Sequence, residues 1–189
     1  RDLIKGEFKN FGFESRFLTN YSFLNKKSYL LLGAKYYNSF SESIQGPGNN
    51  SKNAEFNFDY INFPNYVNQS EYIYPNYNFA FFGENIFYLN DKVSITPGFR
   101  FENISTSLDG YYRKINLDAA GNTIYNEVFN EKDTKRRNFI LLGIGLSYKT
   151  NNSEFYTNFS QNFRSVTFAD ISIINPAYAI NPDIDDEKG

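Results

Sequence analysis

The stretch Val93-Ser94-Ile95-Thr96-Pro97-Gly98-Phe99-Arg100-Phe101-Glu102 alternates large apolar residues with small or polar ones. Successive side chains of a β-strand point to opposite faces, so the odd positions from 93 to 101 share one face and the even positions share the other. The odd face is apolar, whereas the even face carries Arg100 and Glu102. This alternation predicts a strand with one apolar face and one face suited to water.

Similar stretches recur along the chain, and apolar residues alternate more often than they recur at helical spacing. We predict strands over residues 11–23, 28–38, 75–89, 93–106, 137–149 and 154–164. Each is at least as long as the ~9–11 residues that a tilted strand needs to cross a bilayer, whereas ordinary strands average about 5–6 residues. The alternation is weaker in the second and third strands. In the third, both faces carry aromatic residues, which are Phe81, Phe82, Phe87 and Tyr88.

The predicted connections alternate in length. Residues 25–27, 90–92 and 150–152 form tight polar turns, and between them lie long polar stretches at residues 39–74 and 107–136, with a third beginning at Ser165. Short periplasmic turns opposite long extracellular loops are typical of an outer-membrane barrel. Within the loops we predict a hairpin at residues 119–122 and a flexible tip at residues 45–50. A soluble β-sandwich remains the alternative.

The composition agrees with strands that have one wet and one apolar face. The chain of 189 residues has 21 Phe and 16 Tyr, yet its mean hydropathy is −0.54. Aromatic residues favour strands, and those beside the tight turns are placed for the aromatic girdle of a membrane barrel. These residues are Tyr21, Phe23, Tyr29, Tyr88, Tyr148 and Phe155.

Several kinds of function are excluded for these 189 residues. The absence of Cys and His removes disulfide frameworks, cysteine zinc sites and histidine catalysis, and the net charge of −2 gives no basis for nucleic-acid binding. We predict no catalytic residue, no metal site and no cofactor. The acidic group Asp183, Asp185, Asp186 and Glu187 lacks the spacing of a calcium loop and is interpreted as a solvated turn.

The candidate ligand-binding residues are arginines. Arg100 and Arg164 fall on the predicted polar face, and a guanidinium fork matches a carboxylate, so both suit an anionic ligand such as citrate. Pairing of Arg100 with the wall carboxylate Glu102 is the alternative. The long loops add tyrosines and basic residues that include Lys114 and Arg137. The predicted substrate-binding set is Arg100, Arg164, Arg113 and Arg136.

An ordered set of phrases resembles a known family. They are RDLIKG at 1–6, NFG at 10–12, ESRFL at 14–18, FGENIF at 82–87, SITPGFRFE at 94–102, DGYYR at 109–113, SQNFR at 160–164, NP at 175–176 and 181–182, and DEKG at 186–189. The set resembles the barrel of TonB-dependent outer-membrane receptors of the ferric-citrate type.

The resemblance implies an all-β fold, in which residues 1–189 form about six strands of a transmembrane antiparallel β-barrel. The whole would be a plugged, ~22-stranded barrel in the bacterial outer membrane. It would not be an enzyme, and would take up a ferric chelate such as iron citrate or a siderophore. Its partners would be that chelate, the outer-membrane lipid, and TonB through a plug. Since the chain begins at Arg1 rather than Met, we expect an internal piece that lacks the plug and the TonB box.

Two other functions remain open. One is a surface β-protein, an adhesive or binding module whose long loops hold protein or glycan. The other is a plug-less porin. A plug domain and a TonB box upstream of Arg1 would separate the transporter from both.

Overall fold

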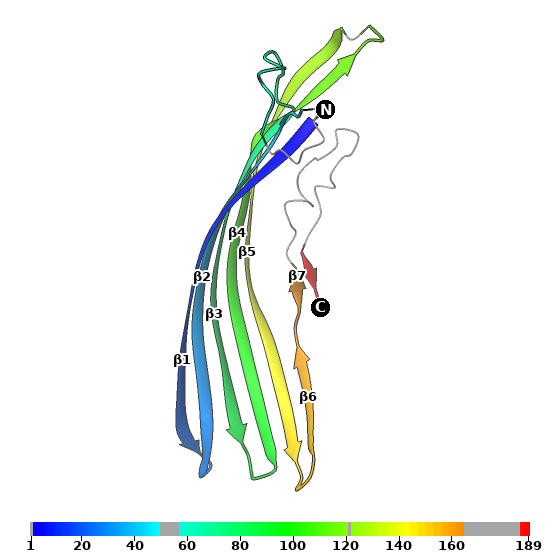
Figure 1. The fold of residues 1–189 in the computed structure, drawn as a ribbon. Coiled ribbons are helices and arrows are strands. Elements are labelled where there is room, and N and C mark those ends of the chain that lie inside the picture. The colour runs from blue at the N-terminus through cyan, green and yellow to red at the C-terminus, as the bar shows by residue number, and fades with distance from the viewer. Residues whose placement is uncertain (1, 50–56, 121, 165–185) are drawn as a thin grey trace.

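A computed structural model describes residues 2–49, 57–120, 122–164 and 186–189. Within these residues, six long strands form one antiparallel sheet in sequence order, from β1 (Asp2–Phe23) through β2 (Lys26–Pro47), β3 (Ser70–Tyr88), β4 (Val93–Leu117) and β5 (Thr123–Lys149) to β6 (Glu154–Ser160) (Figure 1). A second sheet joins the short strands β7 (Phe163–Arg164) and β8 (Glu187–Lys188). The all-β, antiparallel fold class is confirmed. The six-stranded sheet is open, with β1 and β6 at its edges.

All six predicted strands exist, but their ends differ from the prediction. β1 begins at Asp2 rather than at residue 11, and β3 begins at Ser70 rather than at residue 75. Most of the stretch at 107–136 and both ends of the stretch at 39–74 were wrongly predicted as loops, because β4 and β5 meet in one extended hairpin, β2 runs to Pro47 and β3 begins at Ser70. Backbone pairing satisfies amide groups in water as well as in lipid, so the strands continue where the apolar alternation stops.

The sixth strand departs from the prediction in the other direction. β6 ends at Ser160, and residues 163–164 pair with β8 instead of continuing beside β5. The backbone amide of Gln161 still donates to the carbonyl of Leu142 at 3.0 Å, but the return bond goes from the Leu142 amide to the Gln161 side-chain oxygen, also at 3.0 Å. A side chain thus replaces the backbone acceptor, and the ladder ends there.

The tight turns are close to their predicted positions. The first consists of Leu24 and Asn25, with φ values of 50° and 58°, between the paired residues Phe23 and Lys26. Positive φ at both central residues is the signature of a two-residue hairpin turn that matches strand twist. In the second turn, Asn90 Oδ1 accepts the amides of Lys92 and Val93, both at 2.8 Å.

The predicted hairpin at residues 119–122 is confirmed at the tip of β4 and β5. The Asp118 amide donates to the Asn122 carbonyl at 2.9 Å, and Asp118 Oδ1 accepts the amides of Ala120 and Asn122. Gly121, the last residue of the predicted tip at 45–50, and the third long stretch from Ser165 through residue 182 lie outside the described residues.

The strand register assigns every residue of the sheet to one of two faces, because directly paired residues share a face. One face, the apolar face, collects the alternating apolar residues of all six strands. Its members include Phe13, Phe17, Leu30, Leu32, Phe79, Phe81, Phe99, Phe101, Ile140, Leu142, Ile144, Leu146, Phe155 and Phe159. The opposite face, the polar face, carries Arg16, Lys35, Arg100 and Glu102. The third strand also sorts, with Phe81 and Phe87 on the apolar face and Phe82 and Tyr88 on the polar face.

The apolar face forms a band that stops partway along the strands. On β4 it covers residues 93–101, and the next residue on that face, Asn103, bonds through its amide to Asn138 of β5. Beyond this pair the same face carries charges, including the Asp109–Lys132 ion pair. On β4 and β5 the band therefore has about the 9–11 residues that a membrane crossing needs, whereas β6 as a whole has seven.

Four of the six residues expected in an aromatic girdle lie on the apolar face beside the tight turns, namely Tyr21, Phe23, Tyr148 and Phe155. Phe23 and Phe87 lie on the apolar face beside the tight turns, with ring centroids 5.0 Å apart. Tyr29 and Tyr88, which contact one another at 6.4 Å, were wrongly included, because the register places both on the polar face. A single-residue step along a strand changes the face, and proximity to a turn does not reveal it.

Candidate functional site

A straight row of residues crosses the polar face at the level of the apolar band. Arg16, Gly33, Phe82 and Arg100 are directly opposite one another on β1, β2, β3 and β4. The ring of Phe82 extends over Gly33, where a Cβ atom would lie only 2.3 Å from Phe82 Cζ. Guanidinium carbons approach the ring centroid from both sides, Arg16 at 6.0 Å and Arg100 at 5.4 Å. Phe82 is thus held between two cations.

Both arginines of this row already have carboxylate partners. Arg16 Nη2 lies 2.6 Å from Glu14 Oε1, and Arg100 Nε donates to Glu102 Oε1. Glu102 is 7% exposed, so its negative charge depends on Arg100 for compensation. The arrangement corresponds to the alternative stated for Arg100, a wall arginine paired with Glu102. Because both of its arginines are paired with carboxylates, the row stabilises the sheet and does not offer an unpaired cation to a ligand.

The structure does not bring the four predicted arginines together. Arg164 lies on β7, exposed, with Nη1 3.2 Å from Glu187 Oε1. Arg113 and Arg136 lie on the face that carries the apolar band, beyond its end, where Arg113 donates to Asn126 Oδ1 at 2.7 Å. Arg100 lies on the polar face, at the same level of the strands as the apolar band. The sequence positions of these arginines do not show on which face, or at which level of the strands, each one lies.

The neighbours of the two loop arginines do reach the polar face. Lys114 follows Arg113 and Arg137 follows Arg136, and the one-residue step reverses the face. The amino group of Lys114 lies 5.9 Å from the ring centroid of Tyr112 and 5.0 Å from that of Phe129. A cation is thereby presented on the polar face of the long hairpin.

Two stacked aromatic pairs lie on this part of the polar face. The rings of Tyr112 and Phe129 stack at 5.2 Å with an angle of 14°, and those of Tyr72 and Tyr74 stack at 5.9 Å with an angle of 25°. All belong to the polar face, on the part of the sheet beyond the apolar band. We call this group the mouth cluster; it consists of Tyr72, Tyr74, Tyr112, Lys114 and Phe129.

Tyr72 anchors the cluster. Its hydroxyl donates to Glu131 Oε2 at 2.7 Å across the sheet, and its side chain is buried beside Gly110, where a Cβ atom would meet the Tyr72 backbone. Burial, followed by the bond to Glu131, raises the pKa of Tyr72 well above its ordinary value, so it stays a neutral donor. The sequence analysis missed this residue; the alternation Tyr72, Tyr74 was the available signal.

The loop that enters β3 is tied to the start of β1. The Tyr66 hydroxyl donates to Asp2 Oδ1 at 2.7 Å, and the Gln69 side chain donates to both Tyr66 and Asp2. Burial, together with the bond to Asp2, raises the pKa of Tyr66 to about 12. These hydrogen bonds hold the loop next to the start of β3, the strand that carries Tyr72 and Tyr74.

The acidic turn near the end of the chain supplies ion-pair partners. Asp186 pairs with the buried Arg137 of β5, and Glu187 pairs with Arg164. Phe163 of β7 stacks on Phe139, a polar-face residue of β5, with centroids 3.7 Å apart. Asp183 and Asp185 lie outside the described residues, and the described ranges contain no cluster of three or more possible metal-ligating side chains.

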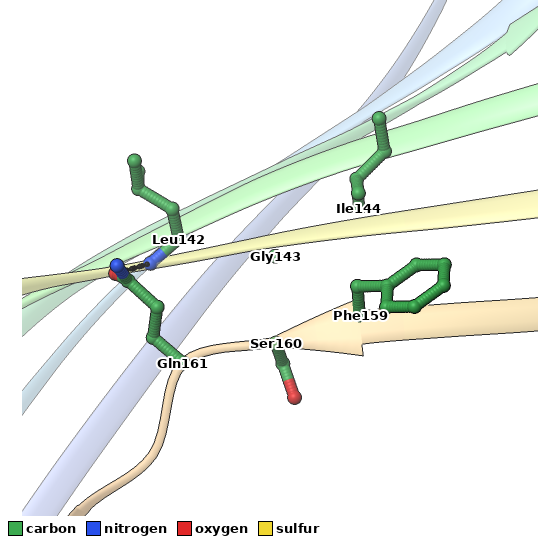
Figure 2. A pocket seen from close by; sticks show the side chains of 6 residues that line it. All are labelled: Leu142, Gly143, Ile144, Phe159, Ser160 and Gln161. Atoms are coloured by element: carbon green, nitrogen blue, oxygen red, sulfur yellow. Dashed lines mark hydrogen bonds between the residues drawn. The ribbon is translucent and has the colours of Figure 1, made fainter. Parts of the chain in front are cut away.

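A hollow of about 350 Å³ opens where β6 leaves the sheet (Figure 2). Its lining includes Leu142, Ile144 and Phe159 from the apolar face, and the Gln161 side chain closes one end by its bond to the Leu142 amide. The lining offers no charged group, so this edge hollow does not suit an anionic ligand.

Comparison with known proteins identifies the chain's family. Residues 4–189 match the model of the TonB-dependent receptor-like β-barrel, so the chain belongs to that family. Barrel domains of this family occur in the bacterial outer membrane, and the family's members are transporters rather than enzymes. None of the curated proteins compared with the chain matches it. The described residues contain no helix long and apolar enough to cross a membrane.

Proposed function

We propose that this chain forms part of the wall and mouth of a TonB-dependent transporter that takes up an anionic ferric chelate, such as iron citrate or a siderophore. The mouth cluster carries the proposal. The cation of Lys114 lies over the stacked rings of Tyr112 and Phe129, and a second stacked pair, Tyr72 and Tyr74, lies on the same face. Such a cation can bind carboxylate or other anionic oxygens while the rings contact the chelate body.

The position of the cluster supports the same function. It lies on the polar face of the strand extensions, past the boundary marked by Asn103 and Asn138, and so on the side of the long connections. Members of this family have the long connections outside the cell. The ligand would meet the cluster before it reaches the row of Arg16, Phe82 and Arg100 within the band.

The test uses the complete receptor and titrates it with ferric citrate. Lys114→Ala should weaken binding about ten- to a hundredfold, the equivalent of a lost charged hydrogen bond of ~1.5–3 kcal/mol. Lys132→Ala is the matched control, because Lys132 is a cation of the same hairpin on the opposite face, with its side chain 80% exposed. Its affinity should equal that of the wild type.

Three results would change the proposal. Equal losses for the two lysine variants would remove the mouth cluster from the site. Arg100 and Arg164 remain predicted ligand contacts, and unchanged affinity in Arg164→Ala would remove that residue. Arg113 and Arg136 were also predicted contacts, but they share the face of Lys132, so their replacement should affect binding as little as that control. A wild type that binds a sugar or peptide but no ferric chelate would overturn the iron assignment and leave the transporter.

A further inference from the structure

The apolar face is hollowed near the tight-turn end by a cavity of about 380 Å³. Leu30 of β2, Gly83 and Phe87 of β3, and Pro97 and Phe99 of β4 line it, and the register places all five on the apolar face. The volume falls in the range of ~300–1,000 Å³ that small-molecule pockets occupy. A protein surface that faces lipid thus contains a site of ligand size.

Local sequence explains the hollow. Pro97 has no amide hydrogen, and the pairing of β3 with β4 is interrupted opposite it, between the pairs Glu84–Gly98 and Phe87–Ile95. Gly83 brings no side chain, and the space where its Cβ would lie is closed by Leu32 and Phe99, whose nearest atoms would be 2.8 and 3.0 Å away. The depression therefore belongs to the folded wall.

The lining also includes two polar residues, Glu84, which the register places on the polar face, and Asn85, which lies on the apolar face and lacks half of its side-chain hydrogen bonds. Asn85 is 8% exposed, and its Oδ1 accepts the hydroxyl of Tyr21 at 3.1 Å. Its Nδ2 is buried and has no partner among the described residues. Burying an unpaired N–H donor is unfavourable, so the amide requires an acceptor that the protein does not provide.

A second donor lies close by on the same face. Ser28, directly opposite Tyr21, is fully buried, and its Oγ also lacks a partner among the described residues. Asn85 lies two residues before Phe87 on the same face of β3, and the ring of Phe87 contacts that of Phe23 with centroids 5.0 Å apart. Aromatic residues at this end of the band mark the membrane–water interface. Just inside that interface, the acceptors available to a barrel wall are the ester carbonyls of lipids.

We infer that the hollow binds a diester phospholipid of the leaflet on the tight-turn side of the membrane. One acyl chain lies between Leu30, Phe87 and Phe99, and an ester carbonyl accepts the hydrogen bond of Asn85 Nδ2. The apolar-face lining includes no cation, so the site recognises the ester and chain rather than the phosphate.

The experiment uses the complete receptor in detergent and measures lipid binding by native mass spectrometry. The probes are a diester phosphatidylethanolamine and its diether analogue, which has the same chains and headgroup but no ester carbonyl. The wild type should bind the diester about two- to tenfold more tightly, as expected for one hydrogen bond. Asn85→Leu should bind the two lipids equally. Asn103→Leu should keep the preference, because Asn103 is an apolar-face asparagine whose amide is bonded to Asn138.

A variant that fills the hollow gives an independent readout. Leu30→Trp should lose both lipids, whereas Leu146→Trp, on the same face but not part of the lining, should retain both. Equal binding of diester and diether by the wild type would overturn the inference. So would a preference that survives in Asn85→Leu, or a receptor dimer that buries this face and excludes both lipids.

Discussion

Arg137 and Asp186, 49 positions apart, form a buried ion pair: Arg137 Nε lies 2.7 and 3.0 Å from the two carboxylate oxygens, and the side chains are 6% and 13% exposed. Arg137 also donates to Thr106 Oγ1 at 3.3 Å. The pair joins the end of the chain to the polar face of β5, just past the apolar band.

Removing one partner of this pair should be costly. We expect Arg137→Ala to destabilise the receptor by about 3–5 kcal/mol, because it leaves Asp186 buried and uncompensated. Hydrogen exchange at the amides of Glu187 and Lys188 should accelerate. Arg164→Ala removes an exposed pair and should cost less than about 1 kcal/mol. Similar effects for the two variants would contradict the role given to Arg137.

The membrane-facing assignment predicts opposite responses from two adjacent residues. Leu142→Arg should cost about 2–4 kcal/mol, since Leu142 is in the apolar band and 56% exposed. Gly143→Arg is at the same depth on the polar face, and a Cβ there meets its neighbours at an ordinary 3.6 Å. It should cost much less. Unfolding in vesicles measures both, and equal costs would reject the assignment of faces.

The close approach of Phe82 to Gly33 predicts strong sensitivity to one methyl group. Gly33→Ala should destabilise the wall by about 1–3 kcal/mol, because the new Cβ overlaps the Phe82 ring and displaces it from between Arg16 and Arg100. Gly143→Ala introduces the same methyl group at an ordinary contact distance of 3.6 Å and serves as the control. Equal stability of the two variants would argue against the stacked row.

Alkaline pH should loosen the loop that Tyr66 holds. The folded pKa of about 12 exceeds the ordinary value of 10.0, so the neutral phenol is favoured in the folded state. Its stabilising contribution is complete below pH 10 and is lost as the pH rises towards 12. Difference spectra between wild type and Tyr66→Phe should show phenolate forming near pH 12. Formation near pH 10 would mean that Tyr66 is neither buried nor bonded to Asp2 in solution.

These 189 residues alone should not form a stable monomer in water. The sheet has open edges at β1 and β6, and large apolar side chains such as Phe13 and Ile140 are about 60% exposed. Sedimentation should show association, and detergent should reduce it. A monomer with a sharp thermal transition in the absence of detergent would favour a soluble β-sandwich.

The sequence by itself determined the number of long strands, their antiparallel order and the two faces of β4 and β5. Strict alternation such as Phe99-Arg100-Phe101 leaves one register that keeps apolar residues together, and tight polar turns force neighbouring strands to pair. It did not determine where strands end. The apolar alternation stops near Asn103, where we expect the membrane to end, whereas backbone pairing continues to Leu117.

The tertiary structure alone decided which polar side chains meet. Arg100 and Glu102 are neighbours on one strand, but the approach of Arg16 to the same Phe82 ring depends on the register of three strand pairs. The same register places Lys114 on the polar face and Arg113 on the opposite face. A shift of one residue in the pairing of any two strands would move every side chain of the shifted strand to the other face. The register of each strand pair therefore decides which polar side chains meet.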